Sequence, residues 1–202
     1  IIRVMLDKEK GKWQVVQMPE VEGAFVSMDP RTGLIRAMVG GFDFYRNKFN
    51  HVTQAWRQPG SSFKPFIYSA ALEKGFTPAT VVNDAPLFFD AGTTGGQPWE
   101  PKNYDGKFEG PMPLRKALAK SKNMISIRIL RSIGAKYGQE WITPFGFEAE
   151  KHPAYLPMAL GAGSVTPLQM ADAYAVFANG GYRINPMLVT RVTDTRGHLL
   201  AQ

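Results

Sequence analysis

The pattern of hydrophobic and polar positions predicts hairpins near both ends of the chain. Residues 13–18 (WQVVQM) indicate a strand, and two apolar runs within residues 23–40 flank a Pro-Arg-Thr-Gly turn, which favours a β-hairpin. Residues 187–194 and 199–202 flank a second turn, Thr-Arg-Gly-His. We therefore expect a lead-in strand, a first hairpin and, at the far end, a second one.

Helical patterns occupy much of the chain between these hairpins. They cover residues 61–75, 113–120, 124–134, 135–147 and 167–181. The first run is apolar on nearly all sides, which is typical of a buried helix. Its Pro65 has to lie in the first turn, and Gly75 is suited to end it. In the last run, Thr166 can cap the helix, with Pro167 at the first helical position.

A stretch rich in Gly, Pro and Asp separates the first two helices. Residues 83–112 predict a long loop, and loops of this length in compact domains are usually functional or disordered. The loop carries five aromatic residues, which argue against disorder: Phe88, Phe89, Trp99, Tyr104 and Phe108. We expect them to attach the loop to the body of the domain.

Composition narrows the chemistry. The 202 residues are 44% hydrophobic and include no cysteine, which excludes thiol catalysis, disulfides and thiolate metal sites. His51, His152 and His198 are scattered without metal-ligand spacing, so we predict neither a metal nor a cofactor. The net charge of +7 is spread along the chain without a nucleic-acid-binding motif, so we expect a solvated basic surface and no nucleic-acid partner.

The most informative short stretch is residues 57–66, RQPGSSFKPF. Residues three apart are neighbours on a helix, so Ser61 can touch Lys64 while Ser62 points elsewhere. A desolvated lysine loses proton affinity and can take the proton of an adjacent serine, which activates the hydroxyl as a nucleophile. Unpartnered N–H groups at the helix start, including that of Ser61, can hold an oxyanion. Ser-x-x-Lys alone, however, is equally typical of a surface helix with a capping serine.

A second polar group lies sixty residues further on. Ser121-Lys122-Asn123 falls at a break between two predicted helices. There the hydroxyl can relay a proton to a leaving amine, and the amide can bind a substrate carbonyl. On its own this triplet is also typical of a helix-capping serine.

Together the two motifs resemble those of penicillin-binding proteins. Four longer stretches resemble the transpeptidase domain of class A, bifunctional members of that family: residues 22–44, 49–66, 117–123 and 159–181. The resemblance implies an α/β (α+β) fold like that of serine β-lactamases, with a mainly antiparallel sheet, helices and a helical lobe. It implies that residues 1–22 are lead-in strands and that residues 23–202 are the domain.

The resemblance also implies a reaction. Ser61 is then the acylated nucleophile, Lys64 its base, Ser121 a proton relay and Asn123 a substrate-positioning residue. The donor is a peptidoglycan stem peptide ending in D-Ala-D-Ala, the acceptor is a neighbouring stem peptide, and β-lactams are covalent inhibitors. The family works on the extracytoplasmic (periplasmic) face of the membrane, with a glycosyltransferase domain and an anchor preceding this region.

One family motif is not found in its usual place. The Lys/Arg-Ser/Thr-Gly triplet has no match between Asn123 and Gln202, and Arg31-Thr32-Gly33 has the right letters in a predicted turn. We expect the latter to serve the turn, because threonine and glycine suit turns. We also expect the parent sequence to continue beyond Gln202, with the domain incomplete at that end and poorly active without the missing strands.

Three other functions fit the motifs. A serine β-lactamase needs a further base to activate water, and no glutamate matches the class A Glu-x-x-Leu-Asn pattern. A D,D-carboxypeptidase would use water instead of an acceptor amine. A non-catalytic β-lactam sensor or wall-binding module would leave Ser61 unacylated.

Overall fold

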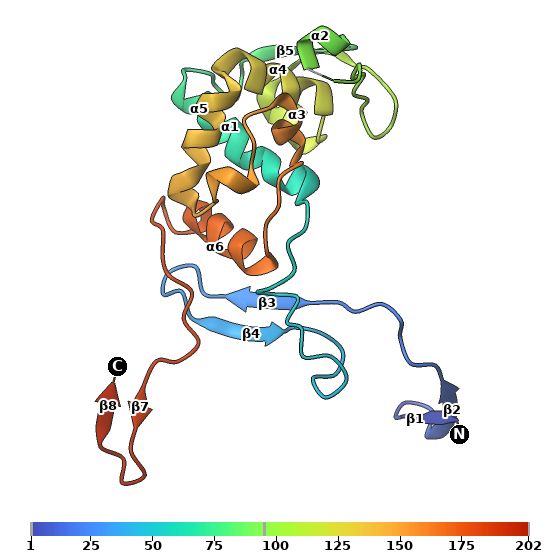
Figure 1. Cartoon of the computed structure of the whole chain (residues 1–202), viewed down its shortest axis with the longest axis vertical. Helices are drawn as coiled ribbons and strands as arrows, with labels where there is room; N and C mark the ends of the chain where they lie inside the picture. Colours follow the sequence, from blue (N-terminus) through green and yellow to red (C-terminus); the bar gives the residue numbers. More distant parts are fainter. Residues whose placement is uncertain (1, 95, 202) are drawn as a thin grey trace.

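The computed structural model describes residues 2–94 and 96–201. Its elements follow the chain in the order shown in Figure 1. The strands are β1 (Arg3–Asp7), β2 (Lys12–Val16), β3 (Phe25–Met28), β4 (Ile35–Val39), β5 (Val81–Asp84), β6 (Gly110–Pro113), β7 (Val192–Thr193) and β8 (Leu199–Ala201). The helices are α1 (Lys64–Glu73), α2 (Ala91–Thr94), α3 (Leu114–Ala119), α4 (Asn123–Ile133), α5 (Ala135–Ile142) and α6 (Pro167–Ala178). Short 3-10 helices are η1 (Gly60–Phe63), η2 (Thr143–Phe145), η3 (Ala149–Lys151) and η4 (Leu156–Leu160).

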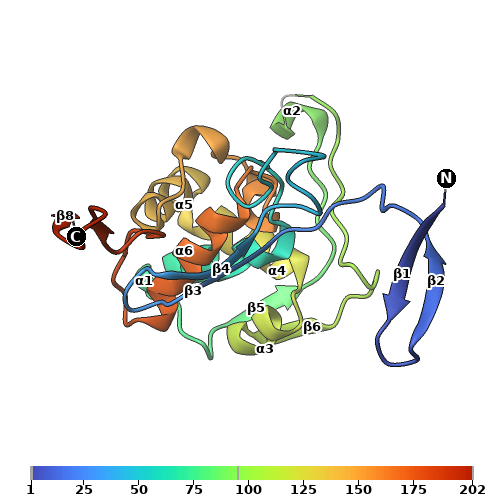
Figure 2. The ribbon, with the colours of Figure 1, turned by 90° about the horizontal axis from the view of Figure 1, so that it is seen from below.

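The strands pair as antiparallel hairpins. Within the described residues there are four two-stranded sheets, β1–β2, β3–β4, β5–β6 and β7–β8. The hairpins predicted over 23–40 and 187–201 are confirmed, with residue 202 outside the described residues. Figure 2 shows β1–β2 set apart from the helices, and Figure 1 shows β3–β4 beneath α6.

The prediction of a continuous loop over residues 83–112 is wrong at both ends of that range. Asp84 pairs with Gly110, and Val81 with Pro113, so these ends form the β5–β6 ladder. Strand propensities do not predict β6, because proline and glycine are rare in strands and this pairing depends on tertiary contacts. Of the loop aromatics, Phe89 is buried and stacks on Trp99, but the other three, Phe88, Tyr104 and Phe108, are exposed. Only the first pair therefore attaches the loop as predicted.

Helix α1 forms the centre of the core, as its all-round apolar pattern predicts. It packs against α4 and α5 and stands at the middle of the helical body in Figure 1. Phe63, Phe66 and Ile67 are fully buried around its start. Burying each such side chain contributes roughly 1.5–3 kcal/mol. This apolar packing offsets the cost of burying the polar residue among them, Lys64.

Several predicted helix ends agree with the structure, but α5 ends at Ile142 instead of residue 147 and α6 at Ala178, before the glycine pair. Pro65 lies in the first turn of α1, and Gly75 follows its end with a φ of +90°. The Thr166 side chain accepts a hydrogen bond of 3.1 Å from the backbone of Gln169, which caps α6. Leu72 differs from the prediction of all-round burial, since it is 45% exposed.

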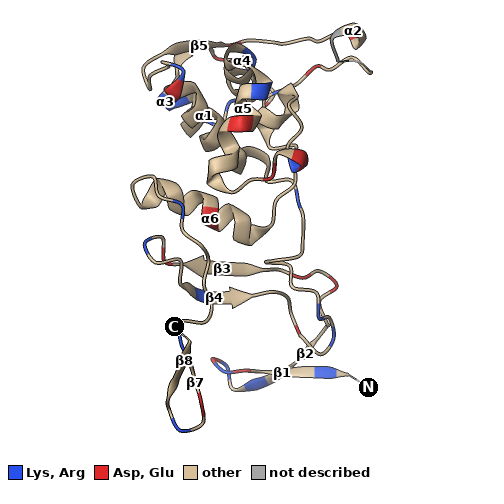
Figure 3. Cartoon of the chain, turned by 60° about the vertical axis from the view of Figure 1, so that its left-hand side comes forward, with Lys and Arg blue, Asp and Glu red and all other residues tan. Residues whose placement is uncertain are grey.

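Helix α6 joins the helical body to the β3–β4 hairpin. It packs on β3, as Figure 3 shows from the side. The Asn179 side chain donates to the Pro30 carbonyl at 2.9 Å and so holds the β3–β4 turn against the end of α6. Lysine, arginine and acidic residues are spread over helices and hairpins alike in Figure 3, in keeping with a solvated charged surface. Across residues 2–94 and 96–201, no helix is both long and apolar enough to cross a membrane.

Candidate active site

The turn that carries Ser61 is held by a close backbone contact. Gly60 lies in η1 and donates its N–H to the Gly161 carbonyl at 3.3 Å. Gly161 has a φ of +72°, and a Cβ placed there would lie 2.1 Å from the Gly60 oxygen. Only glycine fits this approach. Sequence reasoning missed this role of Gly161, although the Gly-Ala-Gly spacing of residues 161–163 was a visible signal.

Lys64 begins α1 and is 1% exposed. Its Nζ donates hydrogen bonds to the Ser121 carbonyl at 2.7 Å, the Ser121 hydroxyl at 3.0 Å and Asn123 Oδ1 at 2.7 Å. The fold thus joins the two sequence motifs through one amine. Three of the four predicted site residues meet at hydrogen-bonding distance.

The environment of Lys64 makes its ammonium ion easier to deprotonate than that of an exposed lysine. Burial lowers the pKa of Lys64 to about 8, because removal from water penalises the ammonium ion. All three hydrogen-bond acceptors of its Nζ are uncharged groups. They satisfy the N–H groups without supplying the negative charge that would hold the proton.

Ser61 and Ser62 open onto different cavities. Ser61 lines a cavity of about 610 Å³ together with Ser121 and Asn123. Ser62 lines a separate cavity beside Met170 and Tyr174. Both serines are exposed, so this difference in surroundings agrees with the prediction that Ser61, not Ser62, faces the site.

The predicted contact between Ser61 and Lys64 is not a hydrogen bond. Within the part of the chain that the structure describes, no hydrogen bond joins Ser61 Oγ to Lys64 Nζ. An ammonium group has three donors, and those of Lys64 are directed at Ser121 and Asn123 instead. Ser61 lies at the wall of the shared cavity, open to a substrate.

Ser121 has an unusual backbone. It lies between the end of α3 and the start of α4, with a φ of +53°, and is the one non-glycine residue with positive φ in the described residues. A left-handed conformation at such a residue costs about 1–3 kcal/mol and is concentrated at functional sites. Here it brings both the carbonyl and the hydroxyl of Ser121 to Lys64.

Asn123 is held on three sides. Its Oδ1 accepts from Lys64, its Nδ2 donates to the Lys102 carbonyl at 2.8 Å, and its backbone N–H donates to Asn103 Oδ1 at 2.8 Å. Asn103 and Lys102 also line the cavity. Sequence reasoning missed Asn103, because its connection to Asn123 depends on chain segments twenty residues apart.

Arg31-Thr32-Gly33 lies in the β3–β4 turn, as predicted. Asp29 Oδ1 accepts the backbone N–H groups of Arg31 at 2.9 Å and Thr32 at 3.3 Å, an arrangement typical of a turn. Gly33 has a φ of +78°. None of the three lines the cavity that contains Ser61.

No histidine is among the described residues that line this cavity. His152 is fully buried, stacks on Phe63 with ring centroids 4.8 Å apart, and burial lowers its pKa to about 4. Over residues 2–94 and 96–201, no group of three or more His, Cys, Asp or Glu side chains is placed to bind a metal ion. Among the described residues that line the cavity, Ser61 and Ser121 supply hydroxyl groups, Asn103 and Asn123 amides, and Asp105 a carboxylate.

A family model of the penicillin-binding protein transpeptidase domain matches residues 23–201. The chain belongs to this transpeptidase family. The resemblance drawn from the sequence motifs is thereby confirmed, and so is the fold class that it implied.

Named relatives of this transpeptidase domain include penicillin-binding proteins 1A. That of Neisseria lactamica is 54% identical over 192 residues, which cover 95% of this chain and 24% of the relative. The structure of penicillin-binding protein 1A from Haemophilus influenzae matches with a TM-score of 0.94 and 43% identity, over 99% of this chain and 29% of that one.

One less similar solved structure is a complex with a β-lactam antibiotic. PonA1 from Mycobacterium tuberculosis, in complex with penicillin V, matches with a TM-score of 0.76 and 28% identity, over 90% of this chain and 51% of that one. This chain spans about a quarter of the length of the curated relatives it matches.

Proposed function

We propose that this chain is the catalytic region of a D,D-transpeptidase that cross-links peptidoglycan stem peptides ending in D-Ala-D-Ala. The observation that carries the proposal is Lys64, a buried amine with a lowered pKa and only neutral partners, beside a cavity that Ser61, Ser121 and Asn123 share. This is the arrangement that activates a serine nucleophile without histidine.

Acylation follows from these contacts. Neutral Lys64 keeps two N–H groups, enough for the Ser121 carbonyl and Asn123 Oδ1, and its lone pair is then free to accept a hydroxyl proton. Ser61 Oγ attacks the carbonyl of the penultimate D-Ala as its proton passes to Lys64. The Ser61 N–H, at the start of the η1 turn, supports the developing oxyanion.

The proton taken up by Lys64 is then passed to the leaving group. Ser121, 3.0 Å from Lys64 Nζ, relays a proton to the amine of the departing D-Ala, while the Asn123 amide orients the peptide. An amine of a neighbouring stem peptide then attacks the acyl carbonyl and forms the cross-link. The ester bond to Ser61 breaks, and the proton that the amine loses passes through Lys64 to Ser61 Oγ. A β-lactam ring opens on Ser61 in the same way and leaves a stable acyl-serine. Binding of a β-lactam by this domain is supported by the PonA1 relative, whose structure is a complex with penicillin V.

The surroundings of the cavity favour transfer over hydrolysis. Among the described residues that line it, Asp105 is the only carboxylate. A hydrogen bond from the Lys107 backbone, aided by Lys122, holds the pKa of Asp105 below its usual value. A carboxylate with a lowered pKa is a weak base for activating water. This observation argues against the β-lactamase alternative, which needs a further base to activate water.

For the whole protein we propose a class A synthase. Its glycosyltransferase domain, anchor and position at the extracytoplasmic face of the membrane are inferred from the likeness to penicillin-binding proteins 1A. Within this chain we assign residues 1–22 to the lead-in and residues 23–202 to the transpeptidase domain. The separation of the β1–β2 hairpin from the helices supports that boundary.

Product analysis tests the function. The complete natural protein is incubated with a donor peptide ending in D-Ala-D-Ala and an amine-bearing acceptor peptide, and products are separated by mass. We expect D-Ala release with a cross-linked product that penicillin abolishes. Release of D-Ala with only hydrolysed donor would indicate a carboxypeptidase, rapid turnover of penicillin a β-lactamase, and no acylation at all a sensor or wall-binding module.

A further inference from the structure

We propose that Lys122, the middle residue of Ser121-Lys122-Asn123, is a positioning residue for the transfer reaction. Its ammonium group draws three carboxylates together and fixes the loop of residues 102–109 against the Ser121 turn. That loop and turn hold the Ser121 hydroxyl and the Asn123 amide on Lys64. The inference rests on the proposed function and adds to it a residue to which the motif assigns no chemical role.

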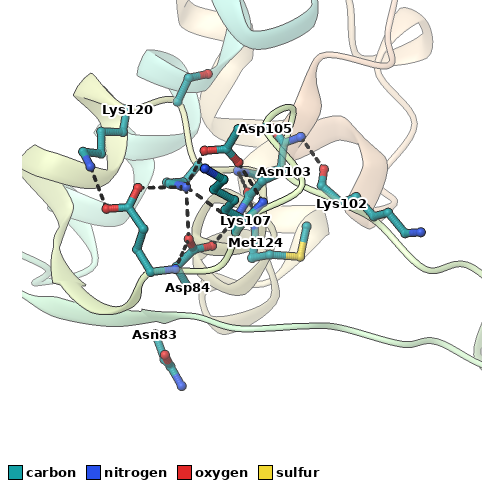
Figure 4. A network of polar contacts seen from close by, with 12 residues as sticks. Asn83, Asp84, Lys102, Asn103, Asp105, Lys107, Lys120 and Met124 are labelled. Atoms are coloured by element: carbon teal, nitrogen blue, oxygen red, sulfur yellow. Dashed lines mark hydrogen bonds and ion pairs between the residues drawn. The ribbon is translucent and has the colours of Figure 1, made fainter.

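The ion cluster has a buried centre, Lys122 and Asp84, and two carboxylates nearer the surface, Asp105 and Glu109. Lys122 is 2% exposed, and its Nζ lies 3.0 Å from Glu109, 3.2 Å from Asp105 and 3.4 Å from Asp84. Figure 4 shows this network of polar contacts around the labelled Asp84 and Asp105. It also donates to the Lys107 carbonyl at 3.4 Å. One cation therefore ties the end of β5, where Asp84 lies, to two acidic residues of the loop.

Asp84 and Asn103 extend this cluster to the start of α4. Asp84 is fully buried and accepts from Asn103 Nδ2 at 2.8 Å and from the Glu109 N–H at 3.0 Å. Asn103 Oδ1 then accepts the N–H groups of Asn123 at 2.8 Å and Met124 at 3.4 Å. Lys122, at the N-cap position, makes no side-chain cap, so Asn103 caps α4 from outside the helix.

The cluster also explains how a strained residue keeps its conformation. Ser121 adopts its positive φ directly before Lys122, and α4 begins directly after it. Backbone strain persists only where surrounding contacts over-determine it. The buried Lys122 side chain supplies such contacts on one side, and the Lys64 hydrogen bonds supply them on the other.

The two buried lysines, Lys64 and Lys122, thus have opposite roles. Burial alone would lower the pKa of Lys122, but hydrogen bonds to Glu109 and Asp105 and the charge of Asp84 outweigh it and raise that pKa above its usual value. Lys122 therefore stays charged at a pH where Lys64, with its lowered pKa, can release its proton. It serves as a fixed cation and not as a second base.

The test measures penicillin acylation of the complete natural protein, separated into the binding constant and the rate of the acylation step at saturation. We compare Lys122→Met, which keeps length but removes charge, with Lys122→Arg, which keeps charge. Displacing reacting groups by about 1 Å can cost about a hundredfold in rate. We expect a loss of that order in the acylation step for Lys122→Met, and substantial rescue by Lys122→Arg.

Controls separate positioning from general damage. Lys136→Met removes a distant, exposed lysine whose ion pair with Glu140 is 3.9 Å long, and it should acylate like the parent. Glu109→Gln removes one charge of the cluster at a residue that does not line the cavity, and should slow acylation several-fold. Circular dichroism and thermal unfolding show whether Lys122→Met folds. If it does not, the acylation rate of Glu109→Gln tests the positioning role instead.

Two results would overturn the inference while leaving the proposed function intact. One is an acylation step within about threefold of the parent in folded Lys122→Met, or in Glu109→Gln if Lys122→Met is unfolded. The other is a weakened binding constant with an unchanged acylation step, because this would make Lys122 a binding residue. A parent protein that penicillin does not acylate would instead refute the proposed function itself, and this inference with it.

Discussion

Replacing Ser61 by alanine is expected to abolish covalent labelling by penicillin. Ser61 shares a cavity with Ser121 and Asn123, which both contact Lys64, so its hydroxyl is the one placed to reach a substrate there. Without an oxygen at this position no acyl bond can form, and the loss should be complete. Fluorescent penicillin followed by denaturing gel electrophoresis measures it.

Ser62→Ala is the matched control. It removes a hydroxyl one residue away that lines a different cavity. The Ser62 carbonyl accepts the Tyr174 hydroxyl at 2.7 Å, and this backbone contact remains in the variant. Labelling should therefore be retained. If both variants lose labelling equally while remaining folded, the choice of Ser61 over Ser62 is wrong.

The second large effect is expected from Lys64→Arg. Arginine keeps the positive charge but stays protonated, so it cannot accept the serine proton. General-base catalysis contributes roughly 10²–10⁴-fold, and we expect a loss within or above that range. Stopped-flow or quenched acylation kinetics with penicillin measure the rate.

A second substitution guards this result against a folding defect. Arginine is bulky for a site that is 1% exposed, so Lys64→Met, which is slim and uncharged, is measured in parallel. Lys136→Arg, at an exposed position, controls for the substitution type. Acylation by either folded Lys64 variant at near the parent rate would remove Lys64 from the mechanism.

Local features of the fold could be predicted because they depend on neighbouring residues. Pro65, Gly75 and the Thr166 cap act within a turn of their own helix, and the structure places each where expected. The hairpin turn at Gly33 is equally local. The family resemblance then supplied what spacing alone could not, the pairing of Ser61 with a motif sixty residues away.

Other features depend on contacts between distant segments. The β5–β6 ladder was missed because proline and glycine mask it. The Asn103 cap on α4 joins separate parts of the chain, and no local pattern indicates it. The positive φ of Ser121 was unexpected as well, since nothing about a serine favours it; it follows from the bonds to Lys64 and the neighbouring ion cluster.

The two lysines illustrate how burial alone does not decide a role. Lys64 and Lys122 are both almost fully buried, yet neutral oxygens surround the first and three carboxylates the second. Environments that push the pKa values of like groups apart often mark distinct catalytic roles. The sequence predicted Lys64 as the base from its spacing to Ser61, and the partners of the two lysines agree with that choice.

The assignment of Lys64 as a neutral base is tested most directly by the pH dependence of penicillin acylation. With a pKa of about 8, Lys64 is protonated at lower pH and inactive as a base. Between about pH 6 and pH 7 the acylation rate constant should rise nearly tenfold, and it should level off above about pH 8.5. Ser62→Ala should show the same profile. A rate that stays constant over this range in the folded protein, or that falls as pH rises, would contradict the assignment.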